Sequence, residues 1–430
     1  LNWDSVGAFG CRVKGITPHI DRVASQGMRF LRAHVTVAVC QPSRSALMTG
    51  RYPHRNGAEG FQPIRENIPT LQERLRAAGY LNGILAKNAH LAPRPRFCWD
   101  LDIEPEQLGH GRDPALYYQH ARAFFQRAKA AGRPFFLMAN SQDPHRPFAG
   151  SERELKQLGL RLPYPRNFSP DEVTVPGFLP DLPGVRQELA EYFTSAHRCD
   201  QTVGEVLRAL EESGAAQQTV VMFLSDNGMS FPFAKTNCYL HSTRTPWIVR
   251  WPGVVQPGSV SDDFISGIDF TPTVLEAAGL APIEGMDGRS FVLSLKGRPQ
   301  PERDHVFTVF HETSARKRYE MRAVQDRRYG YIFNAWADGR TVFRNEAQNG
   351  LAFAAMQAAA RSDARVAERV NFFLHRAPEE LYDYQADPDA LHNLIGEAKH
   401  KPARDRLRRL LAQHLARTGD PVAAAHSKFL

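Results

Sequence analysis

Apolar side chains up to about residue 300 follow two alternating patterns. Leu71, Leu75 and Ala78 recur at helical spacing, and Gly79 closes that segment. Similar helical patterns cover residues 113–133, 185–214 and 269–279. The second of these predicts one long helix, or two helices joined near Gly204.

Short, almost fully apolar runs lie between these helical segments. They fall within residues 81–90, 134–145 and 219–228, and each passes directly into polar residues. Helices that alternate with fully apolar strands predict an α/β fold with a large, mainly parallel sheet between helices. Ligands in such folds gather at the carboxyl ends of the strands. The polar clusters at 87–90, 143–145 and 226–227 are therefore expected at one edge of the sheet.

The pattern changes after about residue 318. Residues 321–336 predict a hairpin, residues 378–394 are rich in turn formers, and residues 403–419 form a basic amphipathic pattern. We expect a smaller C-terminal α+β domain over residues 319–430, after a catalytic domain over residues 1–318. The arginines of the last helix suit a solvated face, because no aromatic residues alternate with them as in a nucleic-acid site.

Charge narrows the classes of partner. The 430 residues carry a formal net charge of +8 and a pI of about 9.3. This favours a polyanion such as a sulfated glycan, although a solvated basic surface explains the same charge. No apolar run approaches the roughly 20 residues that cross a bilayer, so no membrane span is expected.

Cys40 stands in an unusual stretch, VAVCQPSRSALMTGRYPHRNG. Pro42 suits a first helical turn, which would place Cys40 at a helix N-terminus and Arg44 one turn later. Free backbone amides at such an end favour anions. The stretch predicts either an anion site with a reactive group at its mouth, or a buried structural cysteine before a helix.

Several other residues have chemistry that suits an oxyanion. Asp226 and Asn227 offer hard oxygen ligands for Ca²⁺ or Mg²⁺, although Asp-Asn-Gly is also a common turn. Lys87 and His145 each follow an apolar strand, and Lys235 lies in FPFAKTN. Cations and a metal could bind phosphate or sulfate while an acid protonates the leaving group.

CQPSRSALMTG resembles the signature of the type I sulfatases. The resemblance continues through TPHIDRVASQGMRF, FFLMANSQDPHRPF, LSDNG, DFTPTVLEAAG and PEELYDYQADPDALHNL, over nearly the whole chain. It implies the alkaline-phosphatase-like sulfatase fold. It also implies that a maturation enzyme oxidises Cys40 to formylglycine, whose hydrated aldehyde attacks sulfur, and that Arg44 supports this group.

The resemblance assigns further roles by position. Lys87 and Lys235 would bind the sulfate, and His145 would lie on the leaving-group side. Asp226 and Asn227 would be calcium ligands, with Mg²⁺ as the alternative metal. The family usually has histidine two residues after the lysine, whereas here Ala89 takes that place and His90 follows. The paired aspartates that end the family's first strand would precede Leu1, so we expect that strand and half of the metal site to be missing, with weak calcium binding.

SQDPHRP, DNGMSFPFAKTN and YEMRAVQDRRYGYIFN are most similar to the heparan N-sulfatase (sulfamidase) branch, which has arginine where Lys235 stands. The resemblance implies that N-sulfoglucosamine of heparan sulfate is the substrate, that His311 and Glu312 lie near the sugar, and that the setting is exported or lysosomal. A homodimer is compatible with it. The alternatives are a glycan or aryl O-sulfatase, a phosphonate or phosphodiester hydrolase, and a non-catalytic polyanion-binding protein.

Overall fold

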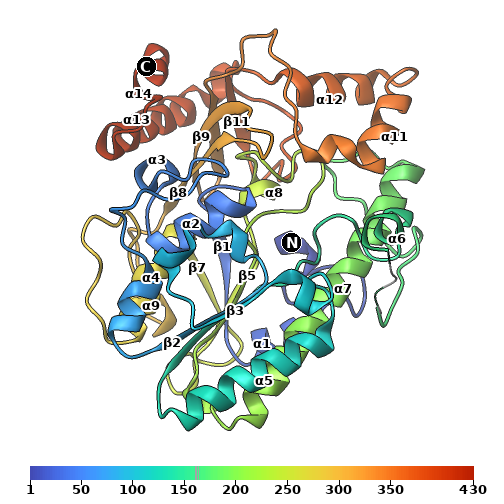
Figure 1. Cartoon of the computed structure of the whole chain (residues 1–430). Coiled ribbons are helices and arrows are strands. Elements are labelled where there is room, and N and C mark those ends of the chain that lie inside the picture. Colours follow the sequence, from blue (N-terminus) through green and yellow to red (C-terminus); the bar gives the residue numbers. More distant parts are fainter. Residues whose placement is uncertain (160–161, 163) are drawn as a thin grey trace.

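The computed structural model describes residues 1–159, 162 and 164–430. Two strand systems form the core of the first two thirds, and an antiparallel sheet follows them in the chain (Figure 1). The strands are β1 Met28–His34, β2 Leu81–Leu85, β3 Leu101–Ile103, β4 Phe135–Ala139, β5 Val221–Leu224, β6 Trp247–Arg250, β7 Ser259–Ser266, β8 His305–Glu312, β9 Arg318–Asp326, β10 Tyr329–Asn334 and β11 Glu379–Asp383.

Helices cover these sheets and connect their strands (Figure 1). They are α1 Pro18–Ser25, α2 Cys40–Thr49, α3 Pro53–Asn56, α4 Leu71–Ala77, α5 Pro114–Ala130, α6 Glu152–Leu158, α7 Pro183–Glu212, α8 Leu240–Thr243, α9 Phe270–Ala277, α10 Val292–Leu295, α11 Leu351–Ala359, α12 Ala364–His375, α13 Lys401–Thr418 and α14 Ala423–His426. Two short 3₁₀ helices, η3 Asn88–His90 and η8 Glu346–Asn349, carry residues of the site described below.

The first strands confirm the mainly parallel α/β prediction. β2 pairs in parallel with both β3 and β4, in the order β3-β2-β4. The second sheet has the order β5-β6-β1-β7, and β6 is antiparallel to both of its neighbours, whereas β1 and β7 are parallel. β4 and β5 are edge strands of different sheets, and both line a cavity of about 940 Å³.

The pattern over residues 185–214 forms one helix. α7 runs without a break from Pro183 to Glu212. Gly204 does not interrupt it, but a β-carbon there would lie 2.6 Å from the ring of His19 on α1. The glycine therefore allows α1 and α7 to approach closely, and the alternative of two joined helices is wrong.

The C-terminal sheet is fully antiparallel, in the order β11-β10-β9-β8. β9 and β10 are the predicted hairpin, and α13 is the predicted basic helix. The sheet already includes β8, and the predicted boundary between residues 318 and 319 falls directly after the first residue of β9, which pairs with β8. An isolated parallel bridge between Val37 and Val309 joins β8 to the segment that leads into α2.

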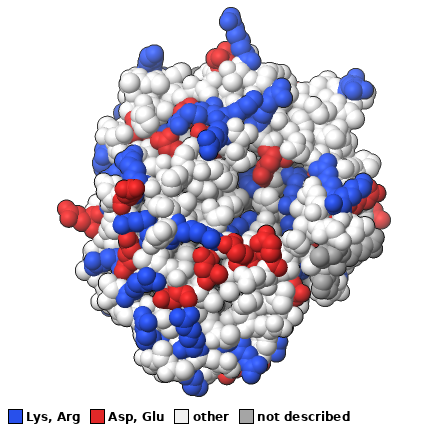
Figure 2. All heavy atoms as spheres, viewed as in Figure 1, with Lys and Arg blue, Asp and Glu red and all other residues white. Residues whose placement is uncertain are grey.

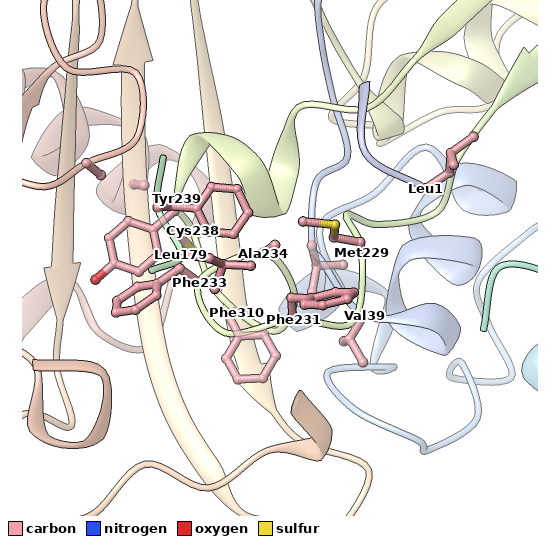
Figure 3. Close-up of a cluster of buried hydrophobic side chains, with 14 of the residues drawn as sticks. Leu1, Val39, Leu179, Met229, Phe231, Phe233, Ala234, Cys238, Tyr239 and Phe310 are labelled. Atoms are coloured by element: carbon pink, nitrogen blue, oxygen red, sulfur yellow. The ribbon is translucent and has the colours of Figure 1, made fainter. Parts of the chain in front are cut away.

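A buried apolar cluster fixes the segment between β5 and α8 against the C-terminal sheet. Figure 3 shows Phe231 beside Val39, whereas Phe233 and Tyr239 lie toward the C-terminal strands. Phe231 is 0% exposed and Phe233 is 2% exposed. Buried aromatic side chains precede Lys235, and the buried Tyr239 follows it. Close packing on both sides holds this segment in a single position.

Candidate active site

Cys40 is the first residue of α2. Val39 precedes it in extended conformation, with φ −153° and ψ 144°, and all ten residues of the helix are buried. The Cys40 thiol donates to Asn227 Oδ1 at 3.6 Å. The predicted helix N-terminus is confirmed, and it points the thiol at the end of β5.

Arg44 joins α2 to the Asp-Asn-Gly turn after β5. Its Nε donates to Asp226 Oδ2 at 3.0 Å, its Nη2 lies 2.9 Å from the same oxygen, and its Nη1 donates to Asn140 Oδ1. Burial by itself would raise the pKa of Asp226, but Arg44 and then Lys87 outweigh it and hold that pKa well below its ordinary value. Asp226 is therefore an anion fixed between cations.

The glycine of this turn is required by close packing. A β-carbon on Gly228 would lie 2.2 Å from the carbonyl oxygens of Ala234 and His241. Only a glycine lets the turn after Asp226 and Asn227 pass so close to the segment that carries Lys235.

Lys87 follows β2 in a left-handed conformation, with φ 57°, and is 7% exposed. Burial lowers its pKa to about 8, while Cys40 and Asp226 act in the opposite direction. His90 ends the 3₁₀ turn that follows, and burial together with Arg44 and Lys87 lowers its pKa to about 3. Both side chains line cavities that contain Cys40.

His145 is held by a buried ion cluster. Arg112 and Arg198 both pair with Asp143, and Arg112 Nη2 also donates to the His145 carbonyl at 3.0 Å. His145 Nδ1 lies 2.7 Å from the Arg146 carbonyl oxygen. A carbonyl only accepts, so Nδ1 carries the proton and Nε2 is left as an acceptor.

Protonation of His145 is disfavoured. Burial, then Lys235 and Lys87, lower its pKa to about 3, and Glu346 only partly opposes them. An anion bound beside the two lysines would reduce this repulsion, which favours the imidazolium form.

Lys235 is 2% exposed and forms an ion pair with Glu346 Oε1. Burial would lower the pKa of Lys235, but Cys40 and Glu346 raise it above its ordinary value. Glu346 comes from η8, more than one hundred residues later in the chain. Our reading of the sequence missed this carboxylate, because no pattern around it indicates a site.

The structure brings eight of the predicted residues together. The larger cavity is lined by Cys40, Arg44, Lys87, His145, Asp226, Asn227 and Lys235. A smaller cavity of about 220 Å³ adjoins the same centre, and its lining includes Cys40, His90, His145, Lys235 and Glu346. Asn140, another residue that sequence reasoning missed, also lines the larger cavity; its place directly after an apolar strand could have indicated it.

His311 and Glu312 are not in this group. His311 is 0% exposed and lies 3.2 Å from Arg322 and 3.8 Å from Glu59, beneath the C-terminal sheet. Glu312 accepts a hydrogen bond from Gln62 at 2.7 Å. Neither side chain lines the two cavities, whereas the next two residues, Thr313 and Ser314, line the smaller one. The expected place of His311 and Glu312 near the sugar stays a prediction.

The donors of Asp226 and Asn227 fit a hard divalent cation. One carboxylate and one amide oxygen are ligands that Ca²⁺ prefers, but Ca²⁺ takes six to eight oxygens. Among the described residues, no group of three His, Cys, Asp or Glu side chains is placed to hold a metal. The Leu1 nitrogen lies beside the pair, 2.9 Å from the Asn227 carbonyl oxygen.

The outer surface contributes less positive charge to anion binding than the cluster around Cys40 does. Figure 2 shows Lys and Arg side chains spread over one face and interspersed with Asp and Glu. The positive charge that matters for an anion is therefore concentrated around Cys40.

None of the described helices is long and apolar enough to cross a membrane.

Family comparisons agree with this site. The sulfatase family model matches residues 1–280, and the model of the N-sulphoglucosamine sulphohydrolase C-terminal region matches residues 229–341. N-sulphoglucosamine sulphohydrolase of Homo sapiens is 31% identical over 440 aligned residues, which cover 95% of this chain and 87% of that protein. An ulvan-active sulfatase of Formosa agariphila is 27% identical, covering 96% of this chain and 78% of that protein.

Solved structures share the fold. The solved structure of BT4656 in complex with its substrate D-glucosamine-2-N,6-O-disulfate has a TM-score of 0.73 at 19% identity, covering 98% of this chain and 96% of that chain. The fold is thus the alkaline-phosphatase-like sulfatase fold. The chain belongs to the sulfatase family, and it is a sulfatase hydrolase with relatives among the heparan N-sulfatases.

Proposed function

We propose that the protein hydrolyses the N-sulfate of glucosamine in heparan sulfate. The supporting observation is the cavity in which Cys40 faces Asn227 among three buried cations, Arg44, Lys87 and Lys235. The chain is similar to N-sulphoglucosamine sulphohydrolase, and the model of that family's C-terminal region matches the residues around Lys235. This similarity favours a sulfamate as the substrate over other sulfated groups. Water and the N-sulfated sugar give sulfate and the free ammonium form of the amine.

Lys87 and Lys235 bind the sulfate oxygens in this proposal. Both are buried, so their charges act at low dielectric, where they stabilise developing negative charge strongly. His145 faces the leaving nitrogen through Nε2 and transfers a proton to it once the bound anion has raised its pKa. Arg112 and Asp143 hold the backbone of His145 in place for that transfer.

Cys40 would be converted to formylglycine, whose hydrated aldehyde supplies the hydroxyl nucleophile. Its position at the N-terminus of α2 suits an oxygen nucleophile, because free amides and the helix dipole favour negative charge there. Asp226 and Asn227 would hold the Ca²⁺ ion. Arg44 keeps Asp226 ionised and ready to bind a cation.

The test is sulfate release from N-sulfoglucosamine beside glucosamine 6-O-sulfate, after co-expression with the formylglycine-generating enzyme and in Ca²⁺. Release from the N-sulfated sugar supports the proposal. Release from the O-sulfated sugar alone contradicts the N-sulfatase assignment and leaves an O-sulfatase.

A Cys40→Ala variant is expected to lose at least about a thousandfold in kcat, because it has no nucleophile. Cys11→Ala is the matched control, since Cys11 is a free cysteine that lines neither cavity. Mass spectrometry of the Cys40 peptide measures its conversion. An intact thiol with full activity would rule out the formylglycine mechanism.

A further inference from the structure

Glu346 is an acidic side chain in a site that is otherwise built for an anion. It lines the small cavity together with Cys40, His145 and Lys235. A carboxylate here repels a sulfate and neutralises part of the Lys235 charge, so it weakens anion binding. Its presence calls for a compensating interaction with another part of the substrate.

One oxygen of Glu346 is fixed. Oε1 pairs with Lys235 and accepts a hydrogen bond from Ser230 Oγ at 2.8 Å. Ser230 in turn accepts from Arg146, which pairs with the buried Glu188 at 2.6 Å. The carboxylate is thus held in one orientation by a connected polar network.

The other oxygen is open to the cavity. Within the described part of the chain, Oε2 makes no hydrogen bond, and His145 Nε2 lies 4.0 Å from it. That nitrogen is an acceptor in the neutral imidazole, so it cannot satisfy Oε2. The side chain is 30% exposed, which leaves Oε2 accessible to a ligand.

Most of the other residues around the small cavity are uncharged. They include Phe61, Thr236, Thr313, Ser314 and Asn345. These groups suit a sugar ring with its hydroxyls. Glu346 is the one carboxylate among the described residues around this cavity.

We propose that Glu346 determines specificity: its Oε2 accepts a hydrogen bond from a sugar hydroxyl or N–H beside the scissile bond, and its charge excludes a second sulfate there. This inference rests on the proposed function, because it places a sugar on the leaving-group side of Cys40. The cavity is small, so a second sulfate on the same ring would share its space with the carboxylate.

The test compares kcat/KM for N-sulfoglucosamine with kcat/KM for glucosamine N,3-O-disulfate, whose second sulfate is on the ring carbon next to the one that carries the scissile nitrogen. The wild type prefers the monosulfated sugar. Glu346→Gln keeps the shape and removes the charge, so it lowers this preference about tenfold or more, mainly through KM. Glu346→Asp keeps the charge and is expected to keep the preference. A preference that is absent in the wild type, unchanged in Glu346→Gln, or lost equally in Glu346→Asp overturns the inference.

Glu152→Gln is the matched control, because Glu152 is 90% exposed on α6, where it pairs with Lys156. Circular dichroism checks that each variant folds. Binding of inorganic sulfate, measured by calorimetry, is the second readout: Glu346→Gln is expected to bind sulfate about fivefold tighter or more, since a like charge is removed. If the wild type hydrolyses neither sugar, the proposed function fails. Sulfate binding then decides the inference, and unchanged or weaker binding in Glu346→Gln overturns it.

Discussion

Lys235 shows at the residue scale how burial strengthens the interactions of a charge. It is 2% exposed, and its ammonium pairs with Glu346 beside the cavity that Cys40 also lines. By sequence it is an ordinary lysine in a loop. Its importance comes from neighbours that the fold places around it, because a buried cation interacts far more strongly than a solvated one.

Removal of the Lys235 ammonium should therefore lower the activity strongly. We expect Lys235→Ala to lower kcat/KM about a hundredfold, because the sulfate loses one of its two lysines and Glu346 loses its ion-pair partner. Lys235→Arg keeps the charge and should retain most of the activity. Steady-state kinetics on N-sulfoglucosamine measures both variants. Equal losses in the two would show that the geometry of the side chain, not its charge, matters.

The residue scale also shows what sequence could and could not find. Cys40, Arg44, Asp226 and Asn227 stand in recognisable motifs, and the structure brings all four together. Glu346 stands in no motif and reaches the site only through the path of the chain. His311 is buried and lines neither cavity, so its expected place near the sugar stays a prediction.

At the scale of elements, α7 packs closely on α1 because Gly204 has no β-carbon. Gly204 lies inside a helix, where glycine costs about 1 kcal/mol relative to alanine. The ring of His19 occupies the space that a β-carbon would need. Close packing of the two helices thus outweighs the local preference for alanine.

This packing predicts that the effect of Gly204→Ala on the free energy of unfolding changes sign when His19 is removed. Gly204→Ala should destabilise the wild type by roughly 1–2 kcal/mol, since the new methyl group meets His19. In a His19→Ala background the same change should stabilise by about 0.5–1 kcal/mol, because only helix propensity remains. Urea unfolding of the four proteins of this double-mutant cycle measures both. The same sign in both backgrounds would show that His19 is not the obstacle.

At the scale of the whole molecule, several histidines in different parts of the chain are kept neutral by their surroundings. His414 on α13 is 3% exposed and stacks on Phe307 of β8 at 3.7 Å. Burial and Arg417 lower its pKa from 6.5 to about 3. Burial likewise lowers the pKa of His90 and His145 to about 3.

These shifts predict lower stability in acid. Between pH 6.5 and about 3 the unfolded chain binds protons at these histidines and the folded chain does not, so the free energy of unfolding falls as pH falls. His414 alone should contribute a loss of roughly 2 kcal/mol between pH 7 and pH 5. Asp200 acts in the opposite sense, because burial raises its pKa to about 7.

Urea unfolding at pH 7, 6 and 5 tests this. A His414→Phe variant should keep the ring stacking and show a shallower dependence on pH than the wild type. An identical dependence in both proteins would mean that folding does not lower the pKa of His414.

The sequence by itself determined the alternation of strands and helices, the helix that begins at Cys40, and the family, because apolar periodicity and short motifs are local properties. The tertiary structure decided which faces are buried and which distant segments meet. It brought Glu346 to Lys235 and turned His311 inward. Such contacts depend on chain paths longer than one hundred residues, and no local pattern records them.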